Sequence, residues 1–395
     1  MAQIIKLPKP RLEVADILRQ YIHDYRQSYP LGPDQSKIIS ALLNCRTANL
    51  GGHVEKCDHC GAERISYHSC RNRHCPKCQQ IPREKWTEAR TQELLPLSYF
   101  HLIFTLPHEL NTVILNNRPV MLKILFKAVS EALLLFGKNK LKGQLGFIAV
   151  LHTWDQKLKA HFHLHCLIAG GAVSKNNKRW IPCKNNYLFN QKALSLVFRG
   201  KFIDHLTRTM RCGKLRFGQG YPLFKNKLYT HQWVVTVREP IKQPERVLQY
   251  LARYTHRVAI ANSRITALDD HQVTFNTKDR KKNKIIPISI TAVEFIRRFL
   301  LHSLPKGFVR IRHYGFLANR NRKANVAHIR RLLKLPAQLL NRSASLKDMM
   351  LKLTGIDITR CSCCKKGRMQ LIAEIPMASG KHPYDYIRPP NYQAC

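Results

Sequence analysis

Residues 161–168 alternate histidine with apolar residues and read His-Phe-His-Leu-His-Cys-Leu-Ile. Successive side chains of a β-strand point to opposite faces, so this order predicts a strand with two unlike faces. His161, His163 and His165 share one face, and the intervening Phe, Leu, Cys and Ile share the other. We expect the apolar face to anchor the strand in a core, while the imidazoles project together into a cleft.

Imidazoles at positions i and i+2 of a strand can bind one divalent metal ion, which could polarise a scissile phosphate. The alternative is a row of histidines that faces solvent or is satisfied by hydrogen bonds. Three histidines in alternation beside an apolar face favour the metal site.

Two CxxC pairs, Cys57/Cys60 and Cys75/Cys78, flank a stretch of fourteen residues. Two residues between thiolates let both sulfurs reach one ion, and four thiolates form the closed tetrahedral shell of a structural Zn²⁺. We therefore predict that these four cysteines bind one zinc ion.

Other cysteine groupings remain open. A second ion could use Cys45, Cys70 and a histidine, because zinc accepts mixed shells. The pair Cys361/Cys364 is either a half-site completed by other residues or unliganded. The remaining histidines of the segment are expected to pack beside a site rather than to bind: His53, His68 and His74.

Residues 244–260 are predicted to form a helix, because Pro244 suits a first turn. Tyr250 and Tyr254 are four residues apart and so lie on one face of that helix. Both could be core aromatics. A row of arginines beside Tyr250 instead favours contact with DNA phosphates: Arg246, Arg253 and Arg257.

The charge of the chain points to a polyanionic partner. It has 67 Lys+Arg against 24 Asp+Glu, a formal net charge of +43, yet 44% of its residues are hydrophobic. In a folded protein, this excess of positive charge favours nucleic acid as the partner. The alternatives are a ribosome-associated protein and a membrane-surface protein. Three residues would add positive charge to the cysteine segment and contact DNA: Arg71, Arg73 and Lys77.

The sequence shows no apolar run near the roughly 20 residues that span a bilayer. Residues 1–11 lack the apolar stretch of a secretory signal. We expect a cytoplasmic protein without a membrane partner, whose thiols are reduced and serve as metal ligands or buried residues rather than disulfides.

Motifs spread along most of the chain resemble the IS91 family of rolling-circle insertion-sequence transposases. This family belongs to the HUH nucleases, named for a histidine–hydrophobe–histidine motif. The motifs are Cys45-Arg-Thr-Ala-Asn-Leu-Gly-Gly-His53, Ser69-Cys-Arg-Asn-Arg-His-Cys-Pro-Lys-Cys-Gln79, Phe104-Thr-Leu-Pro-His108, His163-Leu-His165-Cys166, Tyr250-Leu-Ala-Arg-Tyr-Thr-His-Arg257 and Arg310-Ile-Arg-His-Tyr-Gly-Phe316.

The resemblance implies an α+β fold: an N-terminal helical and zinc-binding module, a palm-like antiparallel-sheet HUH nuclease domain with flanking helices, and a basic C-terminal region. It implies that His163 and His165 hold Mg²⁺ or Mn²⁺, whereas His161 lies outside the shell. Tyr250 and Tyr254 would be the nucleophiles that form 5′-phosphotyrosine bonds with single-stranded element ends and target DNA. A third metal ligand is expected among Asp155, Gln156 and His152.

We accordingly expect a helical and zinc-binding DNA-binding domain over residues 1–95, a catalytic domain over 96–332, and a basic tail with a CxxC pair over 333–395. A replication initiator or relaxase with the same chemistry is the nearest alternative. A non-catalytic, zinc-dependent DNA-binding regulator is the alternative from another class.

Overall fold

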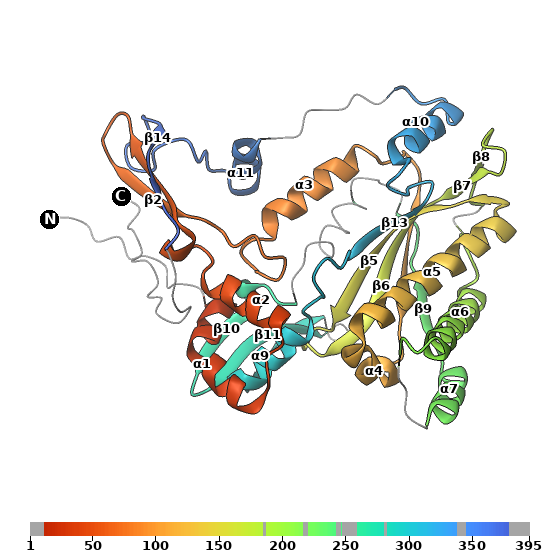
Figure 1. Ribbon diagram of the computed structural model, residues 1–395. Coiled ribbons are helices and arrows are strands. Elements are labelled where there is room, and N and C mark those ends of the chain that lie inside the picture. Colours follow the sequence, from red (N-terminus) through yellow and green to blue (C-terminus); the bar gives the residue numbers. More distant parts are fainter. Residues whose placement is uncertain are drawn as a thin grey trace.

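The computed structural model describes residues 12–184, 187–215, 220–241, 246, 259–279, 283–337 and 345–378. Within them the chain combines helices with antiparallel sheets, which confirms the α+β prediction (Figure 1). The expected N-terminal helical part consists of α1 (Val14–Ser28) and α2 (Pro33–Leu43). None of the described helices is both long and apolar enough to cross a membrane.

A five-stranded antiparallel sheet forms the centre of the molecule, with strand order β13-β5-β6-β3-β9. The strands are β3 (Tyr99–Thr105), β5 (Gly146–Trp154), β6 (Ala160–Ala169), β9 (Val234–Val237) and β13 (Ile311–Gly315). The histidine run therefore lies on β6, the middle strand, as its alternation predicts.

The turn between β5 and β6 sets their register. The carboxylate of Asp155 accepts hydrogen bonds from the backbone N–H groups of Lys157 (2.8 Å) and Lys159 (2.7 Å). Leu158 takes a positive φ of 61° to complete the turn. The resulting pairing places His152 of β5 directly opposite His163 of β6.

Helices cover the two faces of the sheet unequally. Helices α5 (Arg118–Lys140) and α6 (Gln191–Arg211) cover the face that carries the apolar side chains of β6, where Phe104 and Phe198 meet edge to face at 5.2 Å. Helices α3 (Gln80–Thr91) and α10 (Arg322–Leu332) border the opposite face, where Leu167 of β6 shares a core with Val326 (Figure 1). The part of this second face that carries the histidines of β6 is where a functional site could form.

A second core joins the N-terminal helices to the middle of the chain. The sheet β10 (Ile265–Asp269), β11 (Gln272–Asp279), β12 (Lys284–Thr291) and the helix α9 (Ala292–Leu301) pack with α1 and α2. Leu18 and Ile39 share this core with Phe275 and Phe295. The first two helices thus pack on residues that the expected domain division assigns to the catalytic domain.

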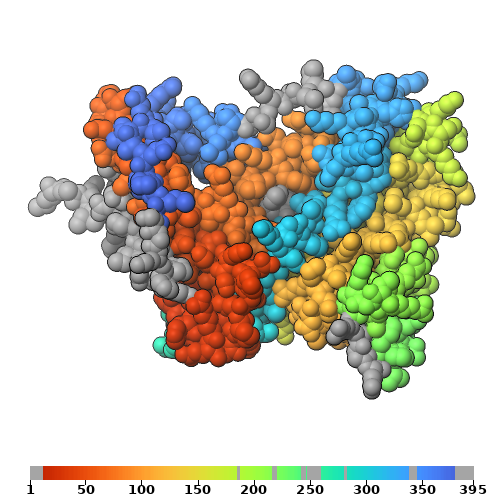
Figure 2. Space-filling model, viewed as in Figure 1, coloured from red at the N-terminus to blue at the C-terminus, as the bar shows by residue number. Residues whose placement is uncertain are grey.

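A third sheet joins the two ends of the described chain. The strand β14 (Met369–Ile375) pairs antiparallel with β1 (Gly52–Cys57), which pairs with β2 (Glu63–Tyr67). Figure 2 shows the blue C-terminal segment lying against the orange N-terminal one. The C-terminal region therefore docks on the N-terminal module rather than extending from the five-stranded sheet.

The remaining elements are short. They are α4 (Asn111–Asn116), α7 (Tyr221–Thr230), α11 (Leu346–Thr354), β4 (Gly143–Gln144), β7 (Gly171–Ser174) and β8 (Trp180–Pro182).

Candidate functional site

Three buried histidines converge on the open end of the central sheet. His163 and His165 come from β6, and His152 comes from β5. Their ligand nitrogens lie within 4.8 Å of one another, close enough to hold one metal ion. The structure thus brings the predicted pair together and adds His152, one of the three candidates for a third ligand.

Hydrogen bonds orient two of these rings. His163 Nδ1 lies 3.0 Å from the backbone carbonyl of His161 and donates to it, so Nε2 is the nitrogen that can bind a metal. His163 Nε2 lies 3.1 Å from His165 Nε2, so two nitrogens that can bind a metal meet at one place. Behind His165, its Nδ1 lies 2.8 Å from Nε2 of His101 on β3.

Burial keeps His165 and the ring behind it, His101, in the neutral state. The pKa of His165 is lowered well below its ordinary value, first by burial and then by His152 and His163. Burial and the nearby Arg238 lower the pKa of His101 to about 4. Both rings are therefore neutral at physiological pH, and only a neutral imidazole can bind a metal.

The other candidate ligands have different roles. Asp155 uses its carboxylate to hold the β5–β6 turn. Gln156 lines the cavity next to the histidines, and its backbone carbonyl accepts from Arg264. His161 is exposed, and it does not belong to the converging group.

Basic side chains surround the histidines in a cavity of about 450 Å³. Exposed Arg238 and Lys278 line it together with Arg264. Arg264 is fixed by donating to the carbonyls of Asn276 (2.8 Å) and Gln156 (2.6 Å). Sequence reasoning missed these cations, because each lies outside the histidine strand and only the fold brings it there.

The predicted tyrosines, Tyr250 and Tyr254, lie outside the described residues, as do Arg253 and Arg257. Arg246 is described and exposed.

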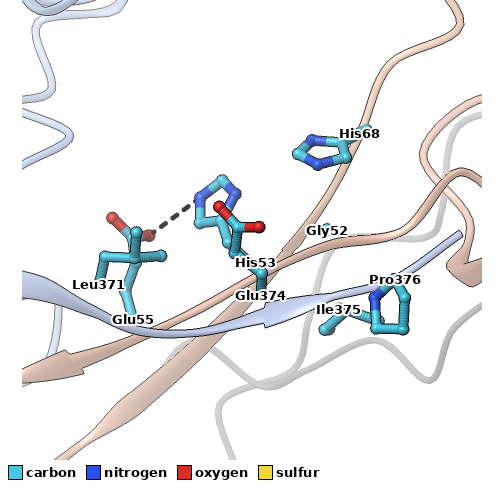
Figure 3. A pocket seen from close by; sticks show the side chains of 8 residues that line it. All are labelled: Gly52, His53, Glu55, His68, Leu371, Glu374, Ile375 and Pro376. Atoms are coloured by element: carbon cyan, nitrogen blue, oxygen red, sulfur yellow. Dashed lines mark ion pairs between the residues drawn. The ribbon is translucent and has the colours of Figure 1, made fainter.

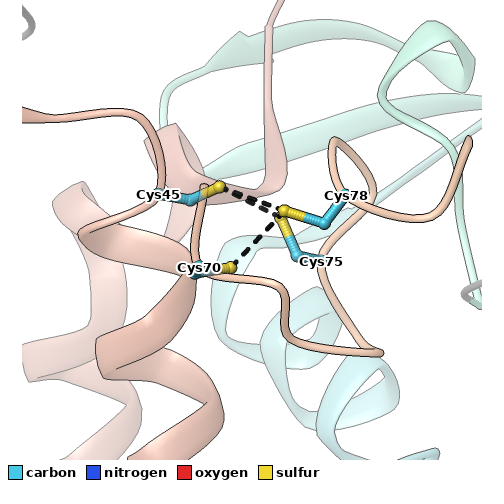
Figure 4. A group of neighbouring side chains, drawn as sticks. All are labelled: Cys45, Cys70, Cys75 and Cys78. Carbon is cyan, nitrogen blue, oxygen red and sulfur yellow. Dashed lines mark hydrogen bonds between the residues drawn. The ribbon is translucent and has the colours of Figure 1, made fainter. Parts of the chain in front are cut away.

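Four cysteines converge beside α2: Cys45, Cys70, Cys75 and Cys78 (Figure 4). The Sγ atom of Cys45 lies 3.4 Å from that of Cys78 and 3.6 Å from that of Cys75. Zinc–sulfur bonds of about 2.3 Å in a tetrahedron place sulfurs roughly 3.8 Å apart. The group therefore has approximately the dimensions of a tetrathiolate zinc shell.

A second group of four contains the other CxxC pair: Cys57, Cys60, Cys361 and Cys364. The predicted single site that combines Cys57 and Cys60 with Cys75 and Cys78 is therefore wrong. A CxxC spacing determines which two sulfurs can share an ion, but the fold determines which pairs meet. The open alternatives agree better with the structure. Cys45 and Cys70 do belong to a converging group, although without a histidine, and Cys361 and Cys364 form half of another.

Two residues predicted to contact DNA have partners within the chain. Arg73 donates to the backbone carbonyls of Phe308 (2.6 Å) and Pro305 (2.9 Å), which attaches the cysteine segment to the catalytic region. Lys77 forms an ion pair with Glu13 at 2.8 Å. Arg71 is exposed and available.

The surplus histidines lie outside both cysteine groups. His74 Nε2 accepts from the backbone N–H of Leu304 (3.2 Å), and burial lowers the pKa of His74 to about 3. His53 and His68 line an open hollow along β1, where His53 Nε2 lies 3.8 Å from a carboxylate oxygen of Glu55 (Figure 3).

Comparison with known proteins agrees with this arrangement. A family model described as putative transposase matches residues 146–325, and one described as transposase zinc-binding domain, of the IS91 type, matches residues 17–106. A putative transposase, y4qJ, from Sinorhizobium fredii is 41% identical over 375 residues, covering 90% of this chain and 94% of that protein. The transposase for insertion sequence element IS801 from Pseudomonas savastanoi pv. phaseolicola is 22% identical over 342 residues, covering 82% of this chain and 80% of that protein. No solved structure matches the chain.

These matches, with the α+β fold and its cysteine clusters, define a transposase with an N-terminal zinc-binding domain. The chain belongs to the IS91 family of transposases, and so it is an enzyme that acts on DNA. The zinc-binding domain and the cysteine clusters both support a structural Zn²⁺.

Proposed function

We propose that this transposase cuts single-stranded DNA at the ends of its element and joins the cut strand to a target through 5′-phosphotyrosine intermediates. The observation that carries the proposal is the convergence of His152, His163 and His165 in a cavity lined by arginine and lysine. The imidazoles can bind a divalent ion, while the arginine and lysine side chains can bind the DNA phosphates beside it.

We propose that the three imidazoles hold a catalytic Mg²⁺ or Mn²⁺. They would leave room at the ion for phosphate and water oxygens, the ligands that both ions prefer. When bound there, the ion would polarise the scissile phosphodiester and stabilise the charge that develops on it. Asp155, engaged in the turn, is not needed as a ligand.

The residues of the cavity wall would position the DNA strand. Arg264 is already held by two backbone carbonyls, so binding a phosphate costs it little additional ordering. Arg238 and Lys278 are exposed and can reach neighbouring phosphates along a strand. The net charge of +43 draws the DNA to the protein from a distance.

We assign the nucleophiles to Tyr250 and Tyr254, which lie within the matched residues 146–325. The phenol oxygen forms a bond to phosphorus and loses its proton to a base, and the bond to the 3′ oxygen breaks. That oxygen takes up a proton and leaves as a 3′-OH. The phosphotyrosine bond conserves the energy of the broken phosphodiester, so rejoining needs no nucleotide cofactor. A second tyrosine allows a second strand end to be held.

A labelled single-stranded oligonucleotide that carries the element end tests the proposal. With Mn²⁺, the wild-type protein should form a covalent adduct that survives denaturing gel electrophoresis, and the Tyr250→Phe/Tyr254→Phe double variant should form none. An adduct with the double variant would overturn the nucleophile assignment. Binding without any adduct by the wild-type protein would favour the non-catalytic regulator.

A second oligonucleotide of target sequence distinguishes the transposase from a replication initiator or relaxase. The transposase should join the cut end to this target. An enzyme of the other two kinds should rejoin the end only to its own cleaved site.

A further inference from the structure

The second group of cysteines joins two parts of the chain that lie more than 300 positions apart. Its members are Cys57, Cys60, Cys361 and Cys364. We infer that this group binds a zinc ion of its own, and that this ion holds residues 345–378 on the N-terminal hairpin. The result is a zinc ribbon, a three-stranded sheet with two metal-binding turns, assembled from both ends of the described chain.

The sulfur positions carry the metal assignment. Cys57 Sγ lies 3.7 Å from Cys364 Sγ, and Cys60 Sγ lies 3.7 Å from Cys361 Sγ. Both separations match the roughly 3.8 Å edge of a tetrahedron with zinc–sulfur bonds of about 2.3 Å. They are far longer than the roughly 2.05 Å bond of a disulfide, and all four thiols are free.

Both turns present backbone N–H groups to their sulfurs. The N–H groups of His59 and Cys60 lie 3.4 and 3.5 Å from Cys57 Sγ. The N–H group of Gly367 lies 3.3 Å from Cys364 Sγ. Donors aimed at sulfur stabilise the thiolate, which is the form that binds zinc. The two turns are therefore built alike, although one follows β1 and the other precedes β14.

The turns also contact each other directly. A Cβ atom on Gly367 would lie 2.5 Å from Cys57 Sγ, so only glycine fits at this position. Asp58 and Arg368 exchange two hydrogen bonds: the Asp58 carboxylate accepts from the Arg368 N–H (2.8 Å), and the Arg368 carbonyl accepts from the Asp58 N–H (3.0 Å). The contacts hold the two cysteine pairs at the same end of the sheet.

Strand pairing alone stabilises the docked position of β14 only weakly. Its register with β1 runs from Gly52 opposite Ile375 to Cys57 opposite Met369, and most of its side chains are exposed. Leu371 is 61% exposed and Ile372 is 51% exposed, so the strand buries little apolar surface. Small sheets without a buried apolar face are marginal in water. A metal ion at the turns supplies the attachment that the side chains do not.

Metal analysis of the purified full chain tests this inference. The wild-type protein should contain two zinc ions per chain, and the Cys361→Ser/Cys364→Ser double variant should contain one. Cys363→Ser is the matched control, because Cys363 lies between these two residues and outside the group; it should keep both ions. One zinc in the wild-type protein, or two in the double variant, would overturn the second site.

Hydrogen exchange tests whether the ion holds the strand. The amides of Met369–Ile375 that pair with β1 should exchange slowly in the wild-type protein and in Cys363→Ser, and rapidly in the double variant. Equal protection in the double variant would show that β14 stays without the metal. If the double variant fails to fold, cobalt loading of the wild-type protein decides the question. Absorption from two tetrathiolate Co²⁺ ions per chain is expected, and absorption from one would refute the inference.

Discussion

The imidazoles of His101 and His165 lie nearly parallel, at an interplanar angle of 5°, and Nε2 of the first lies 2.8 Å from Nδ1 of the second. A histidine on β3 thus holds a histidine of β6 from behind and leaves Nε2 of His165 facing His163. Partners of this kind fix the orientation of a metal-binding ring and raise its basicity. The proposed metal site is therefore supported from three strands, although the converging group itself comes from two.

His101→Ala should weaken Mn²⁺ binding by about 10- to 100-fold, the usual cost of losing a partner behind a metal ligand. His101→Gln, which keeps a polar group near the same place, should lose less. Manganese titration followed by electron paramagnetic resonance measures both. His161→Ala is the control and should bind as the wild type does. Wild-type affinity in His101→Ala would show that the contact does not support the site.

His152→Ala, His163→Ala and His165→Ala should each abolish metal-dependent cleavage while leaving binding to single-stranded DNA nearly unchanged. The reason is that the histidines hold the ion that would polarise the scissile phosphate, whereas the basic surface supplies most of the affinity for DNA. Cleavage and electrophoretic mobility assays on the same oligonucleotide separate the two effects. Full cleavage by His152→Ala alone would remove that residue from the ligand set.

Binding to single-stranded DNA should weaken steeply as salt rises, because cations released from the DNA drive association. Each phosphate contact contributes about 0.7 to the slope of log K against log salt for a single strand. Lys278→Ala should lower that slope by about this amount. Lys138→Ala, an exposed lysine on α5 across the sheet, should leave it unchanged. Equal slopes for both variants would mean that Lys278 contacts no phosphate.

Acid should destabilise the protein partly through His302. This buried ring donates from Nε2 to the carbonyl of Leu158 (3.0 Å), and burial lowers its pKa to about 4. As the pH falls, the histidine of the unfolded chain is therefore protonated before that of the folded chain. The stabilisation of the folded state by neutral His302 is complete above about pH 6.5 and is lost as the pH falls toward 4. The pKa difference corresponds to ~3 kcal/mol at ~1.4 kcal/mol per pH unit.

His302→Gln keeps a donor but cannot be protonated. Its unfolding temperature should therefore fall less than that of the wild type between pH 7 and pH 4.5. Thermal unfolding followed by circular dichroism measures the difference. Parallel losses in both proteins would assign the acid sensitivity to other groups.

Local patterns were enough to predict several elements. The alternation along β6 predicts both the strand and its histidine face, because side chains of a strand must alternate. The expected N-terminal helical module is formed by α1 and α2, with Pro33 in the first turn of α2. In these cases the information lies within a few residues of each position, where a sequence pattern can show it.

The parts that were not predicted depend on contacts between distant residues. The sequence left the third ligand open among three residues, and the β5–β6 register brings His152 to the group by placing it opposite His163. Arg264 reaches the cavity from a short 3-10 helix, Asn262–Arg264, that precedes β10. The predicted grouping of the cysteine pairs is wrong because the pair Cys57/Cys60 meets Cys361 and Cys364 rather than Cys75 and Cys78. The spacing of residues along the chain does not show which of these distant residues come into contact.

The ribbon of β14, β1 and β2 links the metal to the order in which the chain is made. Cys60 and Cys361 are 301 positions apart. Ribosomes add roughly 5–20 residues per second, so the first pair of thiols leaves the ribosome about 15 to 60 s before its partners. Through that time Cys57 and Cys60 form an open half-shell, exposed to oxidation and to other metal ions. A nascent chain that stops short of the second turn never closes this shell, so the ribbon distinguishes a finished transposase from a truncated one.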